Sequence, residues 1–344
     1  MEKEIEKPEQ YPTCVCCKDK PANKTNTHYL TDAIIKKSGN STDNERNKGM
    51  WFNFSSDEPE LKPRFEQSTP KKILDEVFKK ELTDEEIKEY SQKGYAVDNV
   101  FCSDCEDIFT EIETQFTQNI LPKFRGKDLT NISEMDIKEV VTIRLFAYIQ
   151  VLRSALVGEI ELDKKTVDEL RNIVLNYKKL PIEAITNYPL SITYLETKGD
   201  TSLNATGFIP DKNPCLIFMC DFVIQFSESV KDLKPVELNG LNKPEDKLKY
   251  FNVGETLFKV KVMKDEERLE LQKSVSAIPK FVVMMKAIMN TLIDIAEYKF
   301  PYKRFTMYHF MGFTKFLQEK TKDDPLLMTK VNIENYAVEY LSKF

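Results

Sequence analysis

The pattern of hydrophobic and polar positions divides the chain near residue 130. Beyond residue 133, apolar residues recur at helical spacing, and those between 137 and 152 form one wide apolar face. Strands are predicted at 192–196, 215–226 and 251–262, and the middle one shows period-2 alternation. Further helices are predicted at 166–179, 265–276, 279–299, 303–320 and 331–342. The pattern therefore predicts a mixed, helix-rich α/β domain with a mostly antiparallel sheet at 131–344.

The first 130 residues differ in composition, because they hold five of the seven cysteines and the only tryptophan. Helical patterns at 70–81 and 82–92 form an insertion over about 60–95, and the second begins with the capping-box pattern Thr83-Asp84-Glu85-Glu86. We therefore expect an α+β protein in which a small N-terminal module precedes the larger domain.

Composition restricts the chemistry, because 7 cysteines stand against only 2 histidines among 344 residues. A metal site must then be built mainly from thiolates and carboxylates, and histidine-rich catalytic centres are excluded. With only 10 glycines, the composition also argues against a glycine-rich phosphate loop. One of the two histidines, His309, lies in an aromatic segment of an expected helix, and we interpret it as structural.

Charge and apolar patterning indicate a cytoplasmic protein without a membrane segment. The formal charge is −6, so nucleic acid would bind only at a local basic patch. The charged N-terminus lacks the apolar core of a signal peptide, and the longest apolar stretches are too short to cross a bilayer. In a reducing compartment, clustered cysteines hold metal more often than they form disulfides.

Two cysteine pairs have the spacing of zinc knuckles. Cys14 and Cys17 form the first pair, and Cys102 and Cys105 form the second, which runs directly into a helical pattern at 106–116. Four thiolates on two such turns suit tetrahedral Zn²⁺. The spacing therefore predicts a structural zinc site with its last ligand at a helix start, as in a treble clef. The long separation of the pairs keeps scattered, unrelated cysteines as the alternative.

The other three cysteines receive simpler interpretations. Cys16 is expected to be a bystander that could exchange with Cys14 as a ligand. Cys215 and Cys220 lie five positions apart on the predicted strand 215–226 without a third partner, so ordinary packing is expected.

Between the knuckles lies the segment Lys24-Thr-Asn-Thr-His28-Tyr-Leu-Thr-Asp32. A CxxC knuckle, a histidine at the end of a short strand, and a second CxxC followed by glutamate resemble the HNH, or ββα-metal, endonucleases of bacteria. The resemblance covers about residues 14–125. It implies a ββα-metal module with metal-dependent hydrolysis of nucleic-acid phosphodiesters, DNA as the partner, and an association with defence against phage or other foreign DNA.

The resemblance also implies roles for individual residues. His28 takes the place of the general base, and a neutral imidazole near pH 7 suits that role. The positions that hold the catalytic Mg²⁺ or Mn²⁺ are Thr27 and Glu106, of which Glu106 is a good oxygen ligand and Thr27 a poor substitute for a carboxylate. Asn53, in the strand-like segment 50–55, is a further candidate. The alternative is a non-catalytic, zinc-stabilised adaptor or nucleic-acid-binding protein that has lost the cation site.

Basic residues near the motif are candidates for phosphate contacts. Segment 18–48 carries seven basic and four acidic residues, against the negative sign of the whole chain. The candidates are Lys24, Lys36, Lys37, Lys123 and Arg125. The alternative is that they only solvate loops. The domain at 131–344 shows no catalytic signature, so recognition, regulation or oligomerisation, with a protein partner or a second copy of the chain, is expected for it.

Overall fold

The computed structural model forms two compact units, described one at a time below. The first unit comprises Met1–Trp51 and Arg64–Val275, and the second Phe52–Pro63 and Ser276–Phe344. The structure describes residues 11–38, 50–53, 62–65, 81–85, 87, 95–198, 206–209, 213–235, 238, 240–243, 248–299, 307–321 and 330–343. No helix in this part of the chain combines the length and apolar character that a bilayer-spanning segment needs.

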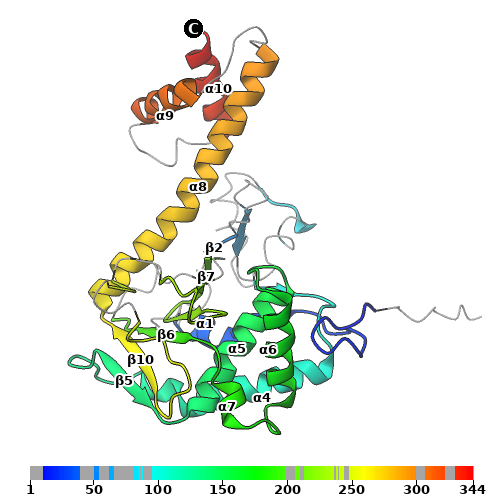
Figure 1. The fold of residues 1–344 in the computed structure, drawn as a ribbon. Coiled ribbons are helices and arrows are strands. Elements are labelled where there is room, and N and C mark those ends of the chain that lie inside the picture. Colours follow the sequence, from blue (N-terminus) through cyan, green and yellow to red (C-terminus); the bar gives the residue numbers. More distant parts are fainter. Residues whose placement is uncertain are drawn as a thin grey trace, which may run out of the picture. The chain divides into compact units, whose positions relative to one another are not determined.

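A six-stranded sheet is the centre of the first unit (Figure 1). Its strands lie in the order β5-β10-β6-β9-β8-β7, and every neighbouring pair is antiparallel except β10 and β6. The strands are β5 (Glu134–Ile137), β6 (Leu190–Leu195), β7 (Thr206–Ile209), β8 (Cys215–Met219), β9 (Phe222–Phe226) and β10 (Phe258–Met263). The mixed α and β composition and the mostly antiparallel sheet are as predicted.

The predicted strand at 215–226 is in fact the hairpin of β8 and β9, in which Met219 pairs with Phe222. Cys220 and Asp221 form the turn, and Cys220 adopts a positive φ of 58°. The sequence concealed this turn because it contains no glycine or proline, and Cys220 and Asp221 continue the period-2 alternation of the segment. Cys215 and Cys220 therefore lie on different parts of the hairpin, and both are buried.

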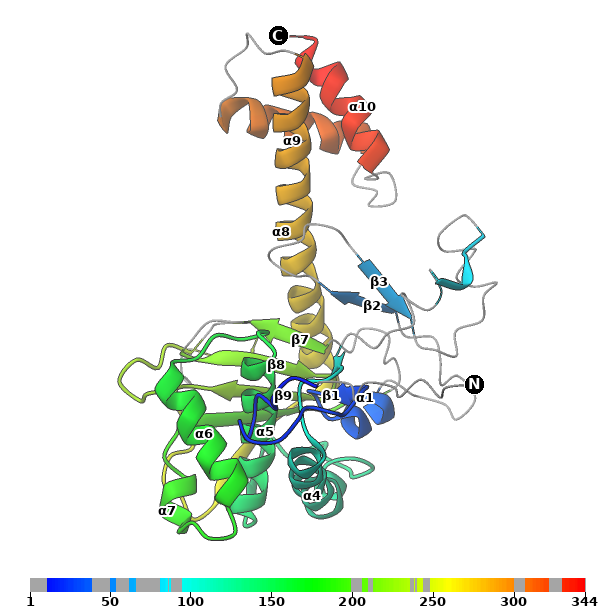
Figure 2. The same cartoon turned by 90° about the vertical axis from the view of Figure 1, so that its right-hand side faces the viewer.

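Three helices pack against one face of the sheet (Figure 2). They are α4 (Ser103–Asn119), α5 (Val140–Leu156) and α6 (Lys164–Asn176). The ring of Phe116 in α4 stacks on Phe146 in α5 at a centroid distance of 3.7 Å and meets Phe222 in β9 edge-on at 5.6 Å. Residues on both sides of the expected boundary at 130 thus share one hydrophobic core, because the apolar face of α4 packs onto α5 and the sheet.

A second apolar cluster lies on the opposite face of the sheet, so both faces are buried. It contains Leu195, Leu216, Phe218, Val223, Leu238, Leu241, Met263 and Leu271. Leu271 belongs to α8 (Asp265–Lys299), a single helix where the sequence predicted two. The boundary between the two units falls within this helix.

The N-terminal part of the first unit is built from short elements. β1 (Thr27–His28) pairs with β4 (Ala96–Val97), and α1 (Asp32–Ser38) follows β1. The other short elements of this unit are η1 (Leu121–Lys123) and α7 (Ile182–Ile185). Strands β2 (Met50–Asn53) and β3 (Lys62–Phe65) pair with each other, and the boundary between the two units falls within each of them. The predicted helix at 70–81 and most of that at 82–92 lie outside the described residues.

The second unit contains the C-terminal part of α8 together with α9 (Met307–Thr321) and α10 (Lys330–Leu341). Its core includes Leu292, Phe313, Leu317, Ala337 and Tyr340. At Gly312, an added Cβ would clash with the hydroxyl of Tyr340, so the missing side chain permits this close contact. His309 is half-buried in α9, in the helix where the sequence placed it.

Candidate metal centre

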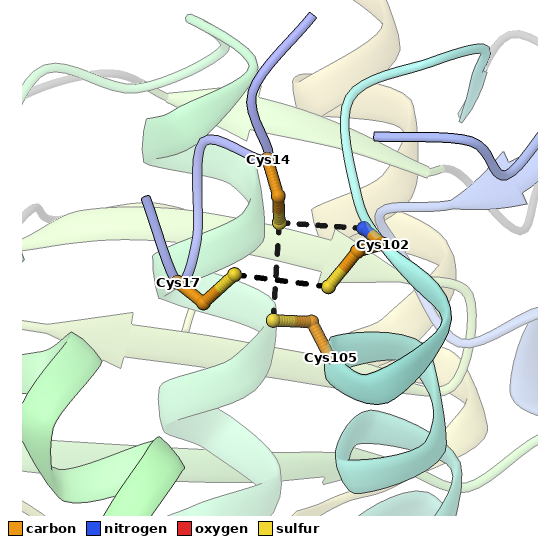
Figure 3. Close-up of side chains that lie close together, drawn as sticks. All are labelled: Cys14, Cys17, Cys102 and Cys105. Atoms are coloured by element: carbon orange, nitrogen blue, oxygen red, sulfur yellow. Dashed lines mark hydrogen bonds between the residues drawn. The ribbon is translucent and has the colours of Figure 1, made fainter. Parts of the chain in front are cut away.

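The four cysteines predicted as zinc ligands come together in one cluster (Figure 3). The sulfur of Cys14 lies 3.8 Å from that of Cys105, and the sulfur of Cys17 lies 3.7 Å from that of Cys102. All four sulfurs lie within 4.8 Å of one another. Zinc binds thiolates at about 2.3 Å, and a tetrahedron with such bonds has edges of about 3.8 Å. The cluster is therefore compatible with a structural Zn²⁺.

A tight loop orients the first cysteine pair. An isolated bridge between Thr13 and Pro21 closes the loop, and the backbone N–H of Cys14 donates to the carbonyl of Lys20 at 2.8 Å. Lys18 donates its N–H to the carbonyl of Cys14 at 2.9 Å and adopts a φ of 59°. This fold of the loop turns the sulfurs of Cys14 and Cys17 towards the same cluster.

The second pair is positioned by the start of α4, as the sequence predicted. Cys102 is the N-cap residue, and its carbonyl accepts a hydrogen bond from the N–H of Glu106 at 3.1 Å. The N–H of Cys102 donates to the sulfur of Cys14 at 3.3 Å. Because Val15 also donates its N–H to the carbonyl of Val100 at 3.1 Å, the two knuckles are joined through their backbones as well as through their sulfurs.

Burial makes most of these thiols poor acids in the absence of a metal. It raises the pKa of Cys14, and it raises the pKa of Cys102 to about 12. A side-chain hydrogen bond with Cys16, together with burial, raises the pKa of Cys105. For Cys17 burial also acts to raise the pKa, but backbone hydrogen bonds from Lys20 and Asp19 outweigh it and lower the pKa to about 7. A bound dication would favour all four thiolates, since its charge is the largest in such a site.

Cys16 is completely buried beside the cluster but is not a member of the group of four. Its contact with Cys105 places it next to one ligand, in keeping with the neighbour role expected for it. Among the described residues the four-cysteine group is the only set of three or more candidate metal-binding side chains.

His28 lies at the end of β1, where it pairs with Ala96. Its side chain is half-buried, and its ring lies 5.4 Å from the ring of Tyr95 at an angle of 43°. The backbone carbonyl of His28 accepts a hydrogen bond of 2.7 Å from Nη1 of Arg153 in α5. The main chain at this histidine is therefore attached to the helix behind it.

Glu106 lies in the first turn of α4, directly after the last cysteine of the cluster. Its Oε1 atom is buried and has no hydrogen-bond partner among the described residues. Burial raises the pKa of Glu106, and the positive charge of Arg153 opposes that rise. Glu106 thus has an unpaired oxygen close to the guanidinium that also holds the His28 carbonyl.

Thr27 joins β1 to β4 through its side chain. The side chain is buried, and its hydroxyl donates to the carbonyl of Val97 at 2.8 Å. This hydrogen bond uses the proton of the hydroxyl, so the expected role of Thr27 in a cation site stays a prediction. The side chain of Asn53 lies outside the described residues, so its expected role stays a prediction.

Of the basic residues expected to contact phosphate, Lys24 is exposed and Lys123 pairs with Glu139 at 2.9 Å. Arg125 instead forms an ion pair with the buried Asp221. Its guanidinium donates to both carboxylate oxygens, at 2.6 and 2.8 Å. Only 20% of its side chain is exposed, contrary to the expected phosphate contact. Lys36 and Lys37 belong to α1, but the positions of their side chains are outside the description.

A buried polar network beside His28 was missed by the sequence reasoning. Arg153 forms an ion pair with Glu113 of α4, and Nη2 of Arg153 also donates to Gln150 at 3.3 Å. Thr31 bonds to both of these partners, donating its hydroxyl to Glu113 at 2.8 Å and its N–H to Gln150 at 3.1 Å. The available signal was the presence of Gln150 and Arg153, three positions apart, in a helix whose other positions are mostly apolar.

Comparison with known proteins assigns no family to the chain. No protein-family model, curated protein or solved structure matches it. The function is therefore inferred from the chemistry of the residues around the cysteine cluster.

Proposed function

We propose that the chain is a metal-dependent, HNH-like endonuclease that hydrolyses phosphodiester bonds of DNA in the cytoplasm. The observation that carries this proposal is the buried, unpaired Oε1 of Glu106 close to Arg153, which also holds the main chain of His28. An unpaired carboxylate oxygen costs free energy unless another group satisfies it. A divalent cation is such a group, and carboxylates are its preferred ligands.

Zinc at Cys14, Cys17, Cys102 and Cys105 has a structural role in this proposal. The order of elements supports a treble-clef arrangement, because a knuckle loop precedes the β1–β4 pair and the second knuckle opens α4. Four thiolate ligands leave no open position on the metal, which is typical of structural zinc and not of catalytic zinc.

The reaction places His28 as the general base that takes a proton from the attacking water. Glu106 offers its unpaired oxygen to Mg²⁺ or Mn²⁺, which when bound supplies positive charge that stabilises the leaving oxygen. We assign a contact with a substrate phosphate to Lys24, because this residue is exposed and acts electrostatically on Glu106. Foreign DNA, including phage DNA, is the substrate that we propose.

The second candidate function is a non-catalytic, zinc-stabilised adaptor that binds nucleic acid. Thr27 favours this candidate. It stands where the HNH pattern has a metal-binding carboxylate, and its hydroxyl is bonded to the carbonyl of Val97. In either case we assign binding of a protein partner or of a second copy to the second unit, where Tyr298 and Met311 are 84% and 65% exposed.

Cleavage assays separate the two candidates. Purified protein is incubated with plasmid DNA and with RNA in the presence of Mg²⁺ or Mn²⁺, beside His28→Ala, Glu106→Gln and the control variant His309→Ala. We expect the wild type and His309→Ala to cleave DNA, and we expect His28→Ala and Glu106→Gln not to cleave it. Cleavage that survives His28→Ala would rule out the assigned base. Binding of DNA without cleavage under any cation would favour the adaptor.

A further inference from the structure

Arg153 has a set of contacts that converge on the segment carrying His28. Its side chain is only 2% exposed, and it extends from α5 into the space between β1 and α4. Its Nη1 donates to the carbonyl of His28 at 2.7 Å, while its Nη2 is paired with Glu113 in α4. The guanidinium carbon also lies 5.2 Å from the ring centre of Phe109 in α4. One side chain therefore joins three elements at the candidate site.

The partners of Arg153 fix the other side of the same segment. Gln150 and Thr31 exchange two hydrogen bonds, of 3.1 and 2.7 Å, and Thr31 also donates to Glu113 at 2.8 Å. The main chain is thus held at residue 28 and again at residue 31. A guanidinium is planar and presents its N–H groups in a rigid fork. The contacts of Arg153 therefore fix the orientation of the His28 carbonyl relative to α4 and α5 as well as its distance from them. A lysine ammonium at the same position would keep the charge but not the fork.

Arg144 provides a comparison on the same helix. It is also fully buried and pairs with a carboxylate, donating from Nη2 to both oxygens of Glu255 at 2.7 and 2.9 Å. It also donates to the hydroxyl of Tyr148 at 2.9 Å and to the carbonyls of Tyr188 and Asn252 at 2.9 and 2.7 Å. Arg144 therefore has a similar burial and a similar ion pair, but its hydrogen bonds go to other segments than the one carrying His28.

We propose that Arg153 is a positioning residue for His28, holding the main chain of β1 and the adjoining turn so that the imidazole keeps one orientation. The inference rests on the proposed function in so far as His28 acts as a base. The chemistry needs such a residue, because a displacement of about 1 Å at a reacting group can lower a rate by roughly 100-fold. β1 has two residues and pairs with β4, so the hydrogen bonds from Arg153 and at Thr31 add fixed points to a short strand.

Kinetic measurements use Arg153→Lys, with Arg144→Lys as the matched control, in the full-length zinc-loaded protein. We expect Arg153→Lys to lower kcat for DNA cleavage by on the order of 100-fold with KM unchanged. Arg144→Lys should retain the wild-type kcat even if it lowers the thermal midpoint of unfolding as much as Arg153→Lys does. If Arg153→Lys does not fold, Glu113→Gln replaces it, because it removes the ion pair and should lower kcat in the same direction.

A spectroscopic measurement tests the positioning without requiring cleavage. The chain has only two histidines, so ¹³C labelling of histidine gives one signal for His28 and one for His309, assigned with His28→Ala. Arg153→Lys should shift or broaden the His28 signal and leave the His309 signal unchanged. Arg144→Lys should change neither signal.

The outcomes separate this inference from the proposed function. An Arg153→Lys protein with wild-type kcat and an unchanged His28 signal would overturn the positioning role. Equal losses of kcat in Arg153→Lys and Arg144→Lys would also overturn it, because the effect would then follow stability alone. A wild-type protein that cleaves no DNA overturns the proposed nuclease, while the His28 signal still decides whether Arg153 holds this histidine.

Discussion

Replacing Phe116 by alanine tests whether the cysteine cluster and the sheet unfold as one cooperative unit. Phe116 is completely buried in α4, stacked on Phe146 and edge-on to Phe222, while Cys105 lies in the first turn of the same helix. Truncation of a buried phenylalanine costs about 3–5 kcal/mol, and two aromatic partners place this one near the upper end. With a urea m-value of about 3 kcal/mol/M, the unfolding midpoint should fall by roughly 1.7 M.

The assay is a urea titration of zinc-loaded protein, followed by far-ultraviolet circular dichroism and by zinc release to a fluorescent indicator. Both midpoints should fall together in Phe116→Ala, because the core that loses the ring also anchors the helix that carries two ligands. The control is Phe313→Ala, in the separate core of the second unit, which should leave the zinc-release midpoint unchanged. Zinc release at the wild-type midpoint in Phe116→Ala would refute the reasoning and favour an independent N-terminal module ending near residue 130.

Four further predictions concern the metal, the ion pairs and the second unit. Elemental analysis should find about one zinc per chain in the wild type and in Cys16→Ser, but little in Cys105→Ser. The reason is that Cys105 belongs to the four-cysteine group and Cys16 does not. Loss of zinc in Cys16→Ser would contradict this assignment. Asp221→Asn should lower the free energy of unfolding by about 3–5 kcal/mol, because it leaves the guanidinium of Arg125 without its charged partner, and the double change Arg125→Met with Asp221→Leu should recover much of that loss in urea titrations. Gly312→Ala should destabilise the second unit by about 1–3 kcal/mol through its clash with the hydroxyl of Tyr340, and adding Tyr340→Phe should relieve the effect in a thermal scan. Hydrogen bonds from Lys249 and Lys259 lower the pKa of Glu134, so its contribution to stability is present above the unfolded pKa and is lost as pH falls through the folded pKa. The deficit of Glu134→Gln, below about 1 kcal/mol at pH 7, should therefore shrink steadily in urea titrations as the pH is lowered below the unfolded pKa.

Local patterns in the sequence were sufficient for the features that depend on neighbouring residues. Examples are the start of a helix at Cys102 and Cys105 and the helical periodicity of α5 and α6. Each of these patterns depends on nearby residues, and the structure has the helices in the predicted places. The spacing within each cysteine pair likewise predicts that its two sulfurs face the same side. The meeting of the two pairs, in contrast, joins residues 85 and 91 positions apart and follows from the tertiary fold.

Features that depend on distant residues could not be predicted in the same way. Arg153 pairs with a glutamate 40 positions away, and Arg125 with an aspartate 96 positions away. Nothing in the segment around either arginine indicates its partner, and Arg125 was therefore interpreted as a free cation. The turn at Cys220 was missed for a different reason, because its residues continue the apolar alternation of the two strands that it joins.

Because several arginines are buried, the net charge of the chain does not give the number of cations that a polyanionic partner could contact. Arg144, Arg153 and Arg268 are fully buried, and each is paired with a carboxylate, so these cations are not available at the surface. Lys18 and Lys20, in the first knuckle loop, are also paired, with Asp168 and Asp104, but these pairs are exposed. An exposed pair contributes only about 0–1 kcal/mol and can be exchanged for a phosphate contact at little cost, whereas a buried pair cannot. The knuckle loop, next to Lys24 and the candidate site, is therefore a surface where binding of nucleic acid costs the fold little.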